Sequence, residues 1–214
     1  MGHMIEGIAL ERGHEIVAHI DAGDAFDLKD AEVAIEFTTP ATAKDNILRA
    51  WAQGVPVVCG STGWDVNELR DESLEFREVE SGKLRVDRNG KTMLVWSSNY
   101  SVGVNIFFEL NKALAEAMQA QPQYSPSIKE IHHIHKLDKP SGTAKTLAEQ
   151  IVESRKSKEK SHIPIESIRE GEVPGTHEVT WDSEEDTIVI THIAKGRRGF
   201  ALGAVLAAEE LKRE

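Results

Sequence analysis

Short β-branched runs alternate with amphipathic stretches along the first hundred residues. The runs predict strands, and the stretches with apolar residues every three or four positions predict helices. The predicted strands cover 15–20, 31–37, 55–59 and 93–96, and the predicted helices cover 5–12, 41–53 and 65–78. Strands and helices that alternate at this spacing are typical of a parallel sheet with helices on its faces.

Local residues refine two of these elements. In the helix over 41–53, Ile47, Leu48 and Trp51 share one face, which we expect to be buried. Between the last helix and the last strand, the polar stretch 82–92 contains Asn89-Gly90, a pair that predicts a tight turn.

The pattern changes after Ser98, where the elements become longer and strands follow one another directly. Helices are predicted over 102–118, 142–154 and 199–212, and strands over 128–136, 178–181 and 187–193. Pro140 and Ser141 have the character of a helix start for the second helix. A second domain is therefore expected to follow the parallel sheet.

A first strand and a glycine loop are expected to be missing from the first domain. A dinucleotide-binding fold normally opens with a strand and a G-x-G-x-x-G loop, whose amides hold the pyrophosphate. Here Met1-Gly2 leads directly into a predicted helix. We therefore expect a Rossmann-like parallel sheet without that strand and loop.

Composition and charge restrict the classes of partner. The 214 residues are 40% hydrophobic and 29% charged, which is ordinary for a globular protein, and the formal net charge is −11. Such a chain is a poor general partner for nucleic acid or an anionic membrane, because both attract positive charge. An anionic ligand would need a local positive field, which 132–136 and 195–198 could provide.

Cysteine content and the start of the chain predict a location. Cys59 is the only cysteine, which excludes an internal disulfide and a cysteine-based metal site. No run approaches the roughly 18 apolar residues of a membrane span, and no secretory signal is visible. A reducing, cytoplasmic setting is therefore expected.

The predicted strands of the first half all end in small or polar residues. Ligands of such sheets bind beyond the carboxyl ends of the strands. These ends are Asp21, 38–40, 60–63 and 97–100, and together they suit a nucleotide that lies across the sheet edge. The Asp21 carboxylate could accept both ribose hydroxyls and would repel a 2′-phosphate, which favours NADH over NADPH. The alternative is that these are ordinary polar loops and that Asp21 is a capping residue.

The segment Glu130 to Ala144, E-I-H-H-I-H-K-L-D-K-P-S-G-T-A, concentrates proton-handling groups. In a strand, His133 and His135 would share one face, and His132, Ile134 and Lys136 the other. An imidazole exchanges protons near pH 7, and a partly desolvated lysine can donate one. The backbone amides of Gly142 and Thr143, at a helix start, could bind a carboxylate. The alternative is that these histidines are structural.

A zinc site is a further alternative for the same histidines, because H-H-x-H has metal-ligand character. His133 and His135 could share an ion, but no cysteine or glutamate stands out as a third ligand on their face. The sequence therefore predicts no metal.

The 130–144 run resembles the signature of the 4-hydroxy-tetrahydrodipicolinate reductase family, also called dihydrodipicolinate reductases. Further motifs match in the right order over nearly the whole chain. They are F-T-T-P at 37–40, G-S-T-G-W at 60–64, S-N-Y-S-V-G-V-N at 98–105, R-E-G at 169–171, V-P-G-T at 173–176 and H-I-A-K-G-R-R-G-F-A-L-G-A-V at 192–205. The 130–144 motif is specific, whereas the glycine-rich motifs would be weak alone.

The resemblance implies a fold, a reaction and an assembly. The dinucleotide-binding domain would cover 1–98 with 199–214 returning to it, and 99–198 would form a substrate-binding and oligomerisation domain with a mixed sheet. The family reduces 4-hydroxy-tetrahydrodipicolinate to tetrahydrodipicolinate with NADH or NADPH, in lysine and diaminopimelate biosynthesis. A homotetramer is implied as well.

The resemblance also implies roles for single residues. His132 matches a proton donor or acceptor, and Lys136 matches a proton donor. The substrate contacts would be His133, Ser141, Gly142 and Thr143. The cofactor contacts would be Gly2, Asp21, Gly60, Ser61, Thr62, Ser97, Ser98, Asn99 and Tyr100. Arg197 and Phe200 fall in a stretch that approaches the site in the family.

Two other functions fit parts of this pattern. A non-catalytic or truncated relative would bind dicarboxylates or only oligomerise, and the missing glycine loop favours it. The intact set of His132, Lys136 and Thr143 argues against it. A different nicotinamide enzyme, such as an amino-acid dehydrogenase, would share the architecture, but P-S-G-T at 140–143 argues against that.

Overall fold

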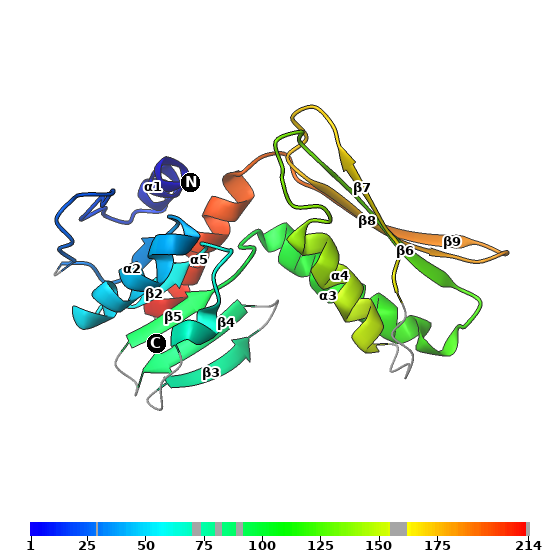
Figure 1. Ribbon diagram of the computed structural model, residues 1–214, viewed down its shortest axis with the longest axis horizontal. Coiled ribbons are helices and arrows are strands. Elements are labelled where there is room, and N and C mark those ends of the chain that lie inside the picture. The colour runs from blue at the N-terminus through cyan, green and yellow to red at the C-terminus, as the bar shows by residue number, and fades with distance from the viewer. Residues whose placement is uncertain (29, 70–73, 80–82, 89–91, 155–161, 213–214) are drawn as a thin grey trace. The chain divides into compact units, whose positions relative to one another are not determined.

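The chain folds into two compact units, which are described separately. The computed structural model describes residues 1–28, 30–69, 74–79, 83–88, 92–154 and 162–212 (Figure 1). Unit 1 consists of Met1–Ser101 with Arg198–Glu214, and unit 2 consists of Val102–Arg197. The chain returns to unit 1 at Arg198, so the last helix of the chain packs on the sheet of unit 1.

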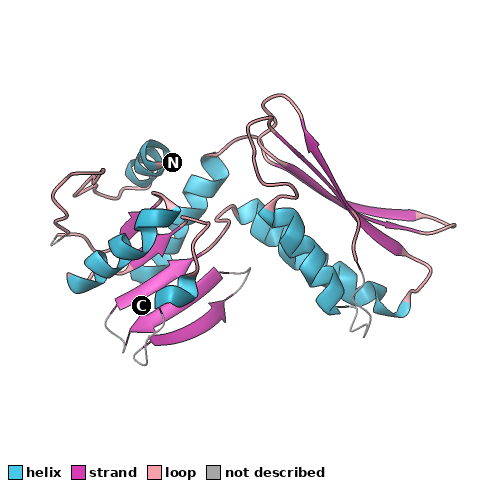
Figure 2. Ribbon diagram, in the orientation of Figure 1, coloured by secondary structure: helices cyan, strands magenta, loops and turns pink. Residues whose placement is uncertain are grey.

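Unit 1 contains a five-stranded sheet in the order β1-β2-β5-β4-β3 (Figure 2). The bounds are β1 Ala34–Glu36, β2 Val57–Cys59, β3 Leu74–Val79, β4 Lys83–Arg88 and β5 Thr92–Trp96. Strands β1, β2 and β5 are parallel, whereas β4 pairs antiparallel with β5 and with β3. The parallel part places the carboxyl ends of three strands side by side.

Helices cover both faces of this parallel part. They are α1 Gly2–Glu11, α2 Pro40–Ala52 and α5 Arg198–Lys212, with a short 3₁₀ helix η1 at Val66–Leu69. Alternate residues of β2 face opposite sides: Val57 and Cys59 pack in the core beneath α2, and Val58 packs in the core beneath α1 and α5. A strand buried on both faces has to be apolar throughout, which explains the sequence V-V-C.

Local chemistry sets the ends of these helices. Gly13 follows α1 with φ +84°, and the His14 and Gly13 amides donate to the Ala9 and Leu10 carbonyls at 3.0 Å. This is a Schellman arrangement, which glycine enters without strain. Pro40 opens α2 at a position whose amide would have no helical partner.

Unit 2 packs two helices on one face of a four-stranded sheet. Its elements are α3 Val102–Ala117, a 3₁₀ helix η3 at Met118–Ala120, β6 Ser125–His132, α4 Gly142–Ser154, β7 Ile165–Arg169, β8 Thr176–Asp182 and β9 Thr187–Ile193. The strand order is β7-β6-β8-β9, with β6 and β7 parallel and the other pairs antiparallel. The sheet is therefore mixed.

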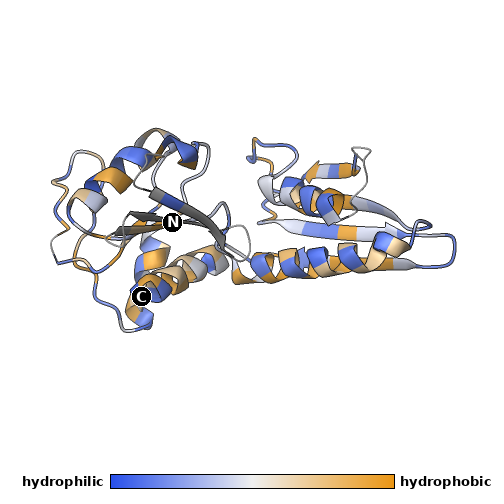
Figure 3. Cartoon of the chain, turned by 90° about the horizontal axis from the view of Figure 1, so that it is seen from below, coloured by the Kyte–Doolittle hydropathy of each residue, from blue (hydrophilic) through white to orange (hydrophobic). Residues whose placement is uncertain are grey.

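The core of unit 2 forms where the buried faces of the strands, with a period of two residues, pack on the apolar faces of the helices, with a period of 3.6 residues. Every second residue of β6 and of β8 is buried, and Ile128, Val179 and Trp181 join Phe107 and Leu147 of the helices in one cluster. Polar and apolar residues alternate along the helices, as Figure 3 shows. The same buried face of the sheet carries Glu130, His132 and His177 at one end, and these side chains form the candidate site.

The structure confirms the predicted fold class: a Rossmann-like parallel sheet and a second α+β unit with a mixed sheet. The predicted helices over 5–12, 41–53, 102–118, 142–154 and 199–212 are present, as are the strands over 31–37, 55–59, 93–96, 178–181 and 187–193, several of them shorter than predicted. Buried strands and amphipathic helices account for most of this agreement.

Several predictions about single elements were wrong. Residues 15–20 pair with no described strand, although Ile16 and Ile20 pack partly buried against the two cores of unit 1. In the helix predicted over 65–78, residues 66–69 instead form η1 and residues 74–78 belong to β3, because pairing with β4 outweighs local helix propensity, and residues 70–73 lie outside the described residues. Leu48 is 41% exposed, unlike its helical neighbours Ile47 and Trp51.

Three further differences concern strands and a turn. Strands β4 and β7 were not expected, and the predicted strand 128–136 ends at His132. The turn predicted at Asn89-Gly90 lies outside the described residues. Among the helices in the described part of the chain, none has the length and apolar character needed to cross a membrane.

Candidate functional site

Strand β6 delivers two functional side chains to the buried face of unit 2. Its alternation places Glu130 and His132 on the same side of the sheet as Ile128. After His132 the chain leaves the sheet, and residues 133–140 lead to α4. The end of the strand therefore separates His132 from Lys136, which was expected to share its strand face.

Glu130 is a fully buried carboxylate that is surrounded by donors. Arg169 of β7 binds it with two nitrogens, at 3.0 Å to Oε2 and 2.9 Å to Oε1, and the Ser141 amide donates to Oε1 at 3.3 Å. Burial alone would raise the Glu130 pKa, but the bonds from Arg169 and His132 outweigh it, so the pKa is lowered. Glu130 is consequently ionised at neutral pH.

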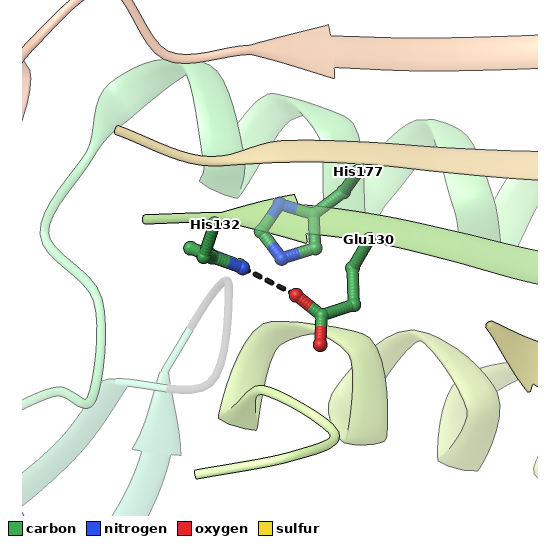
Figure 4. Close-up of side chains that lie close together, drawn as sticks. All are labelled: Glu130, His132 and His177. Atoms are coloured by element: carbon green, nitrogen blue, oxygen red, sulfur yellow. Dashed lines mark hydrogen bonds and ion pairs between the residues drawn. The ribbon is translucent and has the colours of Figure 1, made fainter. Parts of the chain in front are cut away.

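His132 is held by that carboxylate. Its Nδ1 hydrogen-bonds Glu130 Oε2, as Figure 4 shows. A Cβ added at Gly175 would lie 3.1 Å from His132 Nε2, so backbone approaches the other side of the ring. Burial lowers the His132 pKa, against the opposing effect of Glu130. At pH 7 the ring is neutral, with a proton on Nδ1 facing the carboxylate and a lone pair on Nε2.

His177 of β8 is the second buried imidazole of the cluster. Its ring centroid lies 5.0 Å from that of His132, and the rings meet edge to face. Its Nε2 hydrogen-bonds the Ser141 hydroxyl at 3.0 Å. Burial, reinforced by the proximity of His132, lowers the His177 pKa to about 3. His177 is therefore neutral at every pH at which the protein would work.

Lys136 lies on the loop between β6 and α4, where it faces Asp138. The Lys136 ammonium is 2.7 Å from Asp138 Oδ1, and its side chain is 24% exposed. Burial opposes ionisation of Asp138, but the bonds from Lys136 and from the Gly142 amide lower its pKa. An ammonium and the first amide of α4 thus hold one carboxylate of the chain itself.

Glu130, His132 and His177 have potential metal-ligand atoms within 4.8 Å of one another. Their contacts do not fit a cation. Both Glu130 oxygens bind the Arg169 guanidinium, whose positive charge would repel a metal ion at that distance. The geometry therefore favours a hydrogen-bonded cluster.

The remaining predicted substrate residues differ in accessibility. His133 and His135 have ring centroids 6.0 Å apart, and the exposed His135 contacts Glu172 at 3.2 Å. Gly142 is exposed and Thr143 half-buried in the first turn of α4. Ser141 is 2% exposed; its amide binds Glu130 and its hydroxyl binds His177 and the Ala144 amide. Ser141 thus supports the cluster and caps the helix rather than facing a ligand.

Several predicted cofactor residues of unit 1 meet where β1, β2 and β5 end. The Thr38 amide donates to the Ser61 hydroxyl at 2.9 Å, and the Tyr100 hydroxyl bonds the Cys59 carbonyl at 3.0 Å. Ser61, Ser97 and Tyr100 are 6%, 2% and 2% exposed, respectively. These buried side chains support the carboxyl ends of the strands from within the unit, so a bound ligand would contact other, more exposed groups first.

The more accessible predicted residues lie along and around this edge. Thr62 and Ser98 are exposed, and Asn99 is half-buried. A Cβ at Gly60 would lie 2.1 Å from the Phe37 ring, so the absent side chain lets that ring lie against the backbone. Asp21 is exposed in a turn where its amide bonds Asp24, and Gly2 is exposed at the start of α1.

Sequence reasoning missed three members of the cluster: Glu130, Arg169 and His177. The sequence did contain a signal for Glu130: residues two apart in a strand lie on the same face, so Glu130 lies on the same face as His132. Arg169 and His177 belong to or adjoin the matched R-E-G and V-P-G-T motifs. Their contact with β6 depends on strand pairing, which the sequence pattern did not specify.

Comparisons with known proteins agree across the chain. Residues 12–80 match the family model "Dihydrodipicolinate reductase, N-terminus", and residues 103–214 match "Dihydrodipicolinate reductase, C-terminus". The 4-hydroxy-tetrahydrodipicolinate reductase of Christiangramia forsetii is 45% identical over 99% of this chain and 88% of its own length. That of Bdellovibrio bacteriovorus is 36% identical over 97% and 89%, respectively.

A solved structure shows the same fold. Dipicolinate-bound dihydrodipicolinate reductase from Paenisporosarcina sp. TG-14 has a TM-score of 0.70 at 20% identity, over 99% of this chain and 90% of the other. Both family models, the identities and the fold lead to one conclusion: the chain belongs to the dihydrodipicolinate reductase family.

Proposed function

We propose that this protein reduces 4-hydroxy-tetrahydrodipicolinate to tetrahydrodipicolinate with a nicotinamide cofactor, in lysine and diaminopimelate biosynthesis. The observation that carries this proposal is the arrangement of unit 2. A neutral imidazole, an ammonium and the start of α4 lie in one short stretch, in a chain that belongs to this reductase family. This set of groups suits proton transfer to a small dianion.

His132 and Lys136 have complementary protonation states in this mechanism. The nicotinamide cofactor, when bound, supplies a hydride to the unsaturated ring, and the electron density left on the adjacent atom must be quenched by a proton. Lys136 is the cationic donor for that proton. His132, which Glu130 holds with Nε2 unprotonated, is the acceptor that exchanges protons as water leaves.

The substrate carboxylates would be bound by the start of α4. Gly142 and Thr143 are the first two residues of this helix, where amides and the helix dipole favour an anion. Asp138 already shows that the Gly142 amide and Lys136 can share one carboxylate. A substrate carboxylate would join or replace that group, and His133 would contact the substrate from the adjacent loop.

The residues at the strand ends of unit 1 fit a nicotinamide dinucleotide. Exposed hydroxyls of Thr62 and Ser98, with Asn99 nearby in sequence, offer hydrogen bonds at the carboxyl ends of parallel strands, where such folds bind nucleotides. The exposed Asp21 carboxylate would accept ribose hydroxyls and repel a 2′-phosphate. We therefore favour NADH over NADPH. Gly60, Ser61, Ser97 and Tyr100 would shape this edge, and Gly2 would lie near the phosphates.

The face of the second sheet that the helices leave uncovered is proposed as the surface of a homotetramer. Ile190 packs into the core of unit 2, so its neighbours Val189 and Thr191 face the opposite side of β9. Val189 and Ile193 are 47% and 65% exposed. Exposed apolar residues on a strand at the end of the sheet suit pairing between copies.

A cytoplasmic location fits the single, buried thiol of Cys59.

A coupled assay tests the reaction and the roles together. The wild-type protein is mixed with the condensation product of pyruvate and aspartate semialdehyde, and oxidation of NADH or NADPH is followed by absorbance. We expect His132→Ala and Lys136→Ala each to lower turnover roughly 10²–10⁴-fold, because each removes a proton-transfer group. His162→Ala, at an exposed residue of unit 2, and Lys112→Ala, at a half-buried one whose side chain is 44% exposed, should retain wild-type turnover.

Cofactor binding distinguishes the ways in which this proposal can fail. Fluorescence titration should give nearly the same NADH affinity for the wild type and for both variants, because His132 and Lys136 belong to unit 2. Failure of the wild type to oxidise either cofactor would rule out the reductase. Loss of cofactor affinity in the variants would show that these two residues have been given the wrong role.

A further inference from the structure

Arg169 makes an unusually large number of contacts at the end of β7. All three guanidinium nitrogens donate, and the side chain is only 13% exposed. Nη1 and Nη2 bind the two oxygens of Glu130 at 3.0 and 2.9 Å, and Nη1 also donates to the Ile168 carbonyl at 2.7 Å. The guanidinium is thereby fixed in one plane against β6.

The same side chain also binds the loop that follows β6. Nε donates to the Lys136 carbonyl at 3.3 Å, and Nη2 donates to the Asp138 carbonyl at 2.5 Å. Lys136 and Asp138 are in turn joined by their ion pair at 2.7 Å. One guanidinium therefore connects the carboxylate that holds His132 with the backbone that carries Lys136.

We propose that Arg169 is a positioning residue that holds His132, through Glu130, and Lys136, through the loop backbone, in one fixed relative geometry. The inference rests on the proposed function, in which these two side chains exchange protons with the substrate. Proton transfer requires donor and acceptor within hydrogen-bond reach of the reacting atoms. Backbone bonds from the Ile134 amide to the Gly171 carbonyl and from the Lys136 amide to the His133 carbonyl hold the start of the loop. Arg169 adds two side-chain bonds further along it, at the Lys136 and Asp138 carbonyls.

Only an arginine can make this set of contacts. The guanidinium offers five donors in a planar fork, which matches a carboxylate on one edge and leaves donors for the carbonyls. A lysine at the same position keeps the positive charge beside Glu130 but lacks the geometry for two separate carbonyls. Arg169→Lys therefore separates charge from positioning.

The titratable and charged groups around His132 come from several elements, and His177 among them is neutral. Glu130 lies on its own strand, His177 on β8, Arg169 on β7 and Lys136 on the following loop. Arg169→Lys leaves all of these charges in place. A loss of turnover in this variant would consequently report geometry and not a changed electrostatic field.

The test compares Arg169→Lys, Glu130→Gln and the double variant with the wild type. We expect kcat to fall about 10- to 100-fold in each single variant, with KM and the NADH affinity little changed, because the reacting groups are misplaced and the cofactor is not. The double variant should be no worse than the more affected single variant, because both residues act as one unit. Arg12→Lys, which alters a two-bond pair with Glu209 in unit 1, is the matched control and should retain wild-type kcat.

A spectroscopic signal tests the same inference without catalysis. Nitrogen-15 NMR of His132 should show the Nδ1–H tautomer in the wild type and a substantial Nε2–H fraction in Glu130→Gln and in Arg169→Lys. If the wild type reduces no substrate, the proposed function fails, while this signal still decides the positioning role. Four results would each overturn the inference. Two concern kcat in Arg169→Lys: a kcat equal to that of the wild type, or a fall in kcat that only follows the folded fraction. The other two are additive losses in the double variant and an unchanged His132 tautomer in the single variants.

Discussion

At the scale of single residues, burial and partners decide what each ionisable group does. Glu130 remains charged in the core because Arg169, His132 and the Ser141 amide all donate to it. His177, with a hydroxyl as its hydrogen-bond partner, stays neutral instead. The 130–144 motif predicted the presence of proton-handling groups, but their protonation states depend on neighbours from other strands.

The low pKa of His177 predicts an acid-sensitive unit 2. The unfolded chain binds a proton at His177 near the ordinary pKa of 6.5, whereas the folded protein does so only at about 3. The contribution of the neutral His177 to the free energy of unfolding is therefore fully present above pH 6.5. It is lost as the pH falls from 6.5 towards 3, by up to about 1.4 kcal/mol per pH unit.

Urea denaturation at a series of pH values measures this effect. We expect His177→Gln to be less stable than the wild type at pH 7 but to lose less stability between pH 6.5 and 4. The exposed His162 provides the control, because His162→Gln should keep the wild-type slope. Identical slopes for His177→Gln and the wild type would contradict the buried, neutral state of this ring.

At the scale of elements, close packing specifies details that residue patterns do not contain. Gly203 of α5 lies against the Tyr100 carbonyl, and a Cβ at Gly203 would lie 1.6 Å from that oxygen. Because the contact is with backbone, it cannot be relieved by turning a side chain. The glycine is therefore what allows α5 to pack where β5 leads into α3.

Gly203→Ala should consequently destabilise unit 1 by more than about 2 kcal/mol, the cost of forcing a helix away from its packing surface. Gly7→Ala is the matched control, since Gly7 is also helical and a Cβ there meets nothing within 4 Å. That variant should be neutral or stabilising by up to about 1 kcal/mol. Thermal melting of both variants measures the difference, and equal melting temperatures would contradict the close packing of α5.

The elements that the sequence predicted are those whose own pattern is sufficient. Helix α4 has a serine cap and an apolar stripe, and β9 alternates, so both were located to the residue. Strand β3 was mistaken for a helix because its strand character depends on pairing with β4. The strand containing His132 was extended too far because the turn at 133–136 has no glycine to mark it.

At the scale of the whole molecule, the proposed homotetramer requires a surface that a single copy leaves open. A charge on that surface should prevent copies from associating. Val189→Lys places an ammonium among the exposed residues of β9, and we expect it to convert the proposed homotetramer into smaller species. Leu10→Lys changes an apolar residue of α1 that is 54% exposed and should leave assembly unaffected.

Sedimentation velocity at micromolar concentration measures the species present. A wild type that sediments as a monomer would rule out the homotetramer. A Val189→Lys variant that sediments like the wild type would show that a different surface joins the copies.

The sequence by itself determined the family and the two kinds of sheet and supplied the candidate residues for proton transfer, because these depend on local periodicity and on the short 130–144 motif. Only the tertiary structure decided which residues surround His132. Glu130, His177 and Arg169 meet across three paired strands, although His177 lies 47 positions after Glu130 in the sequence. Strand pairing brings such residues together through backbone hydrogen bonds that almost every residue type can form, so the pattern of side chains along the chain does not reveal which strands pair.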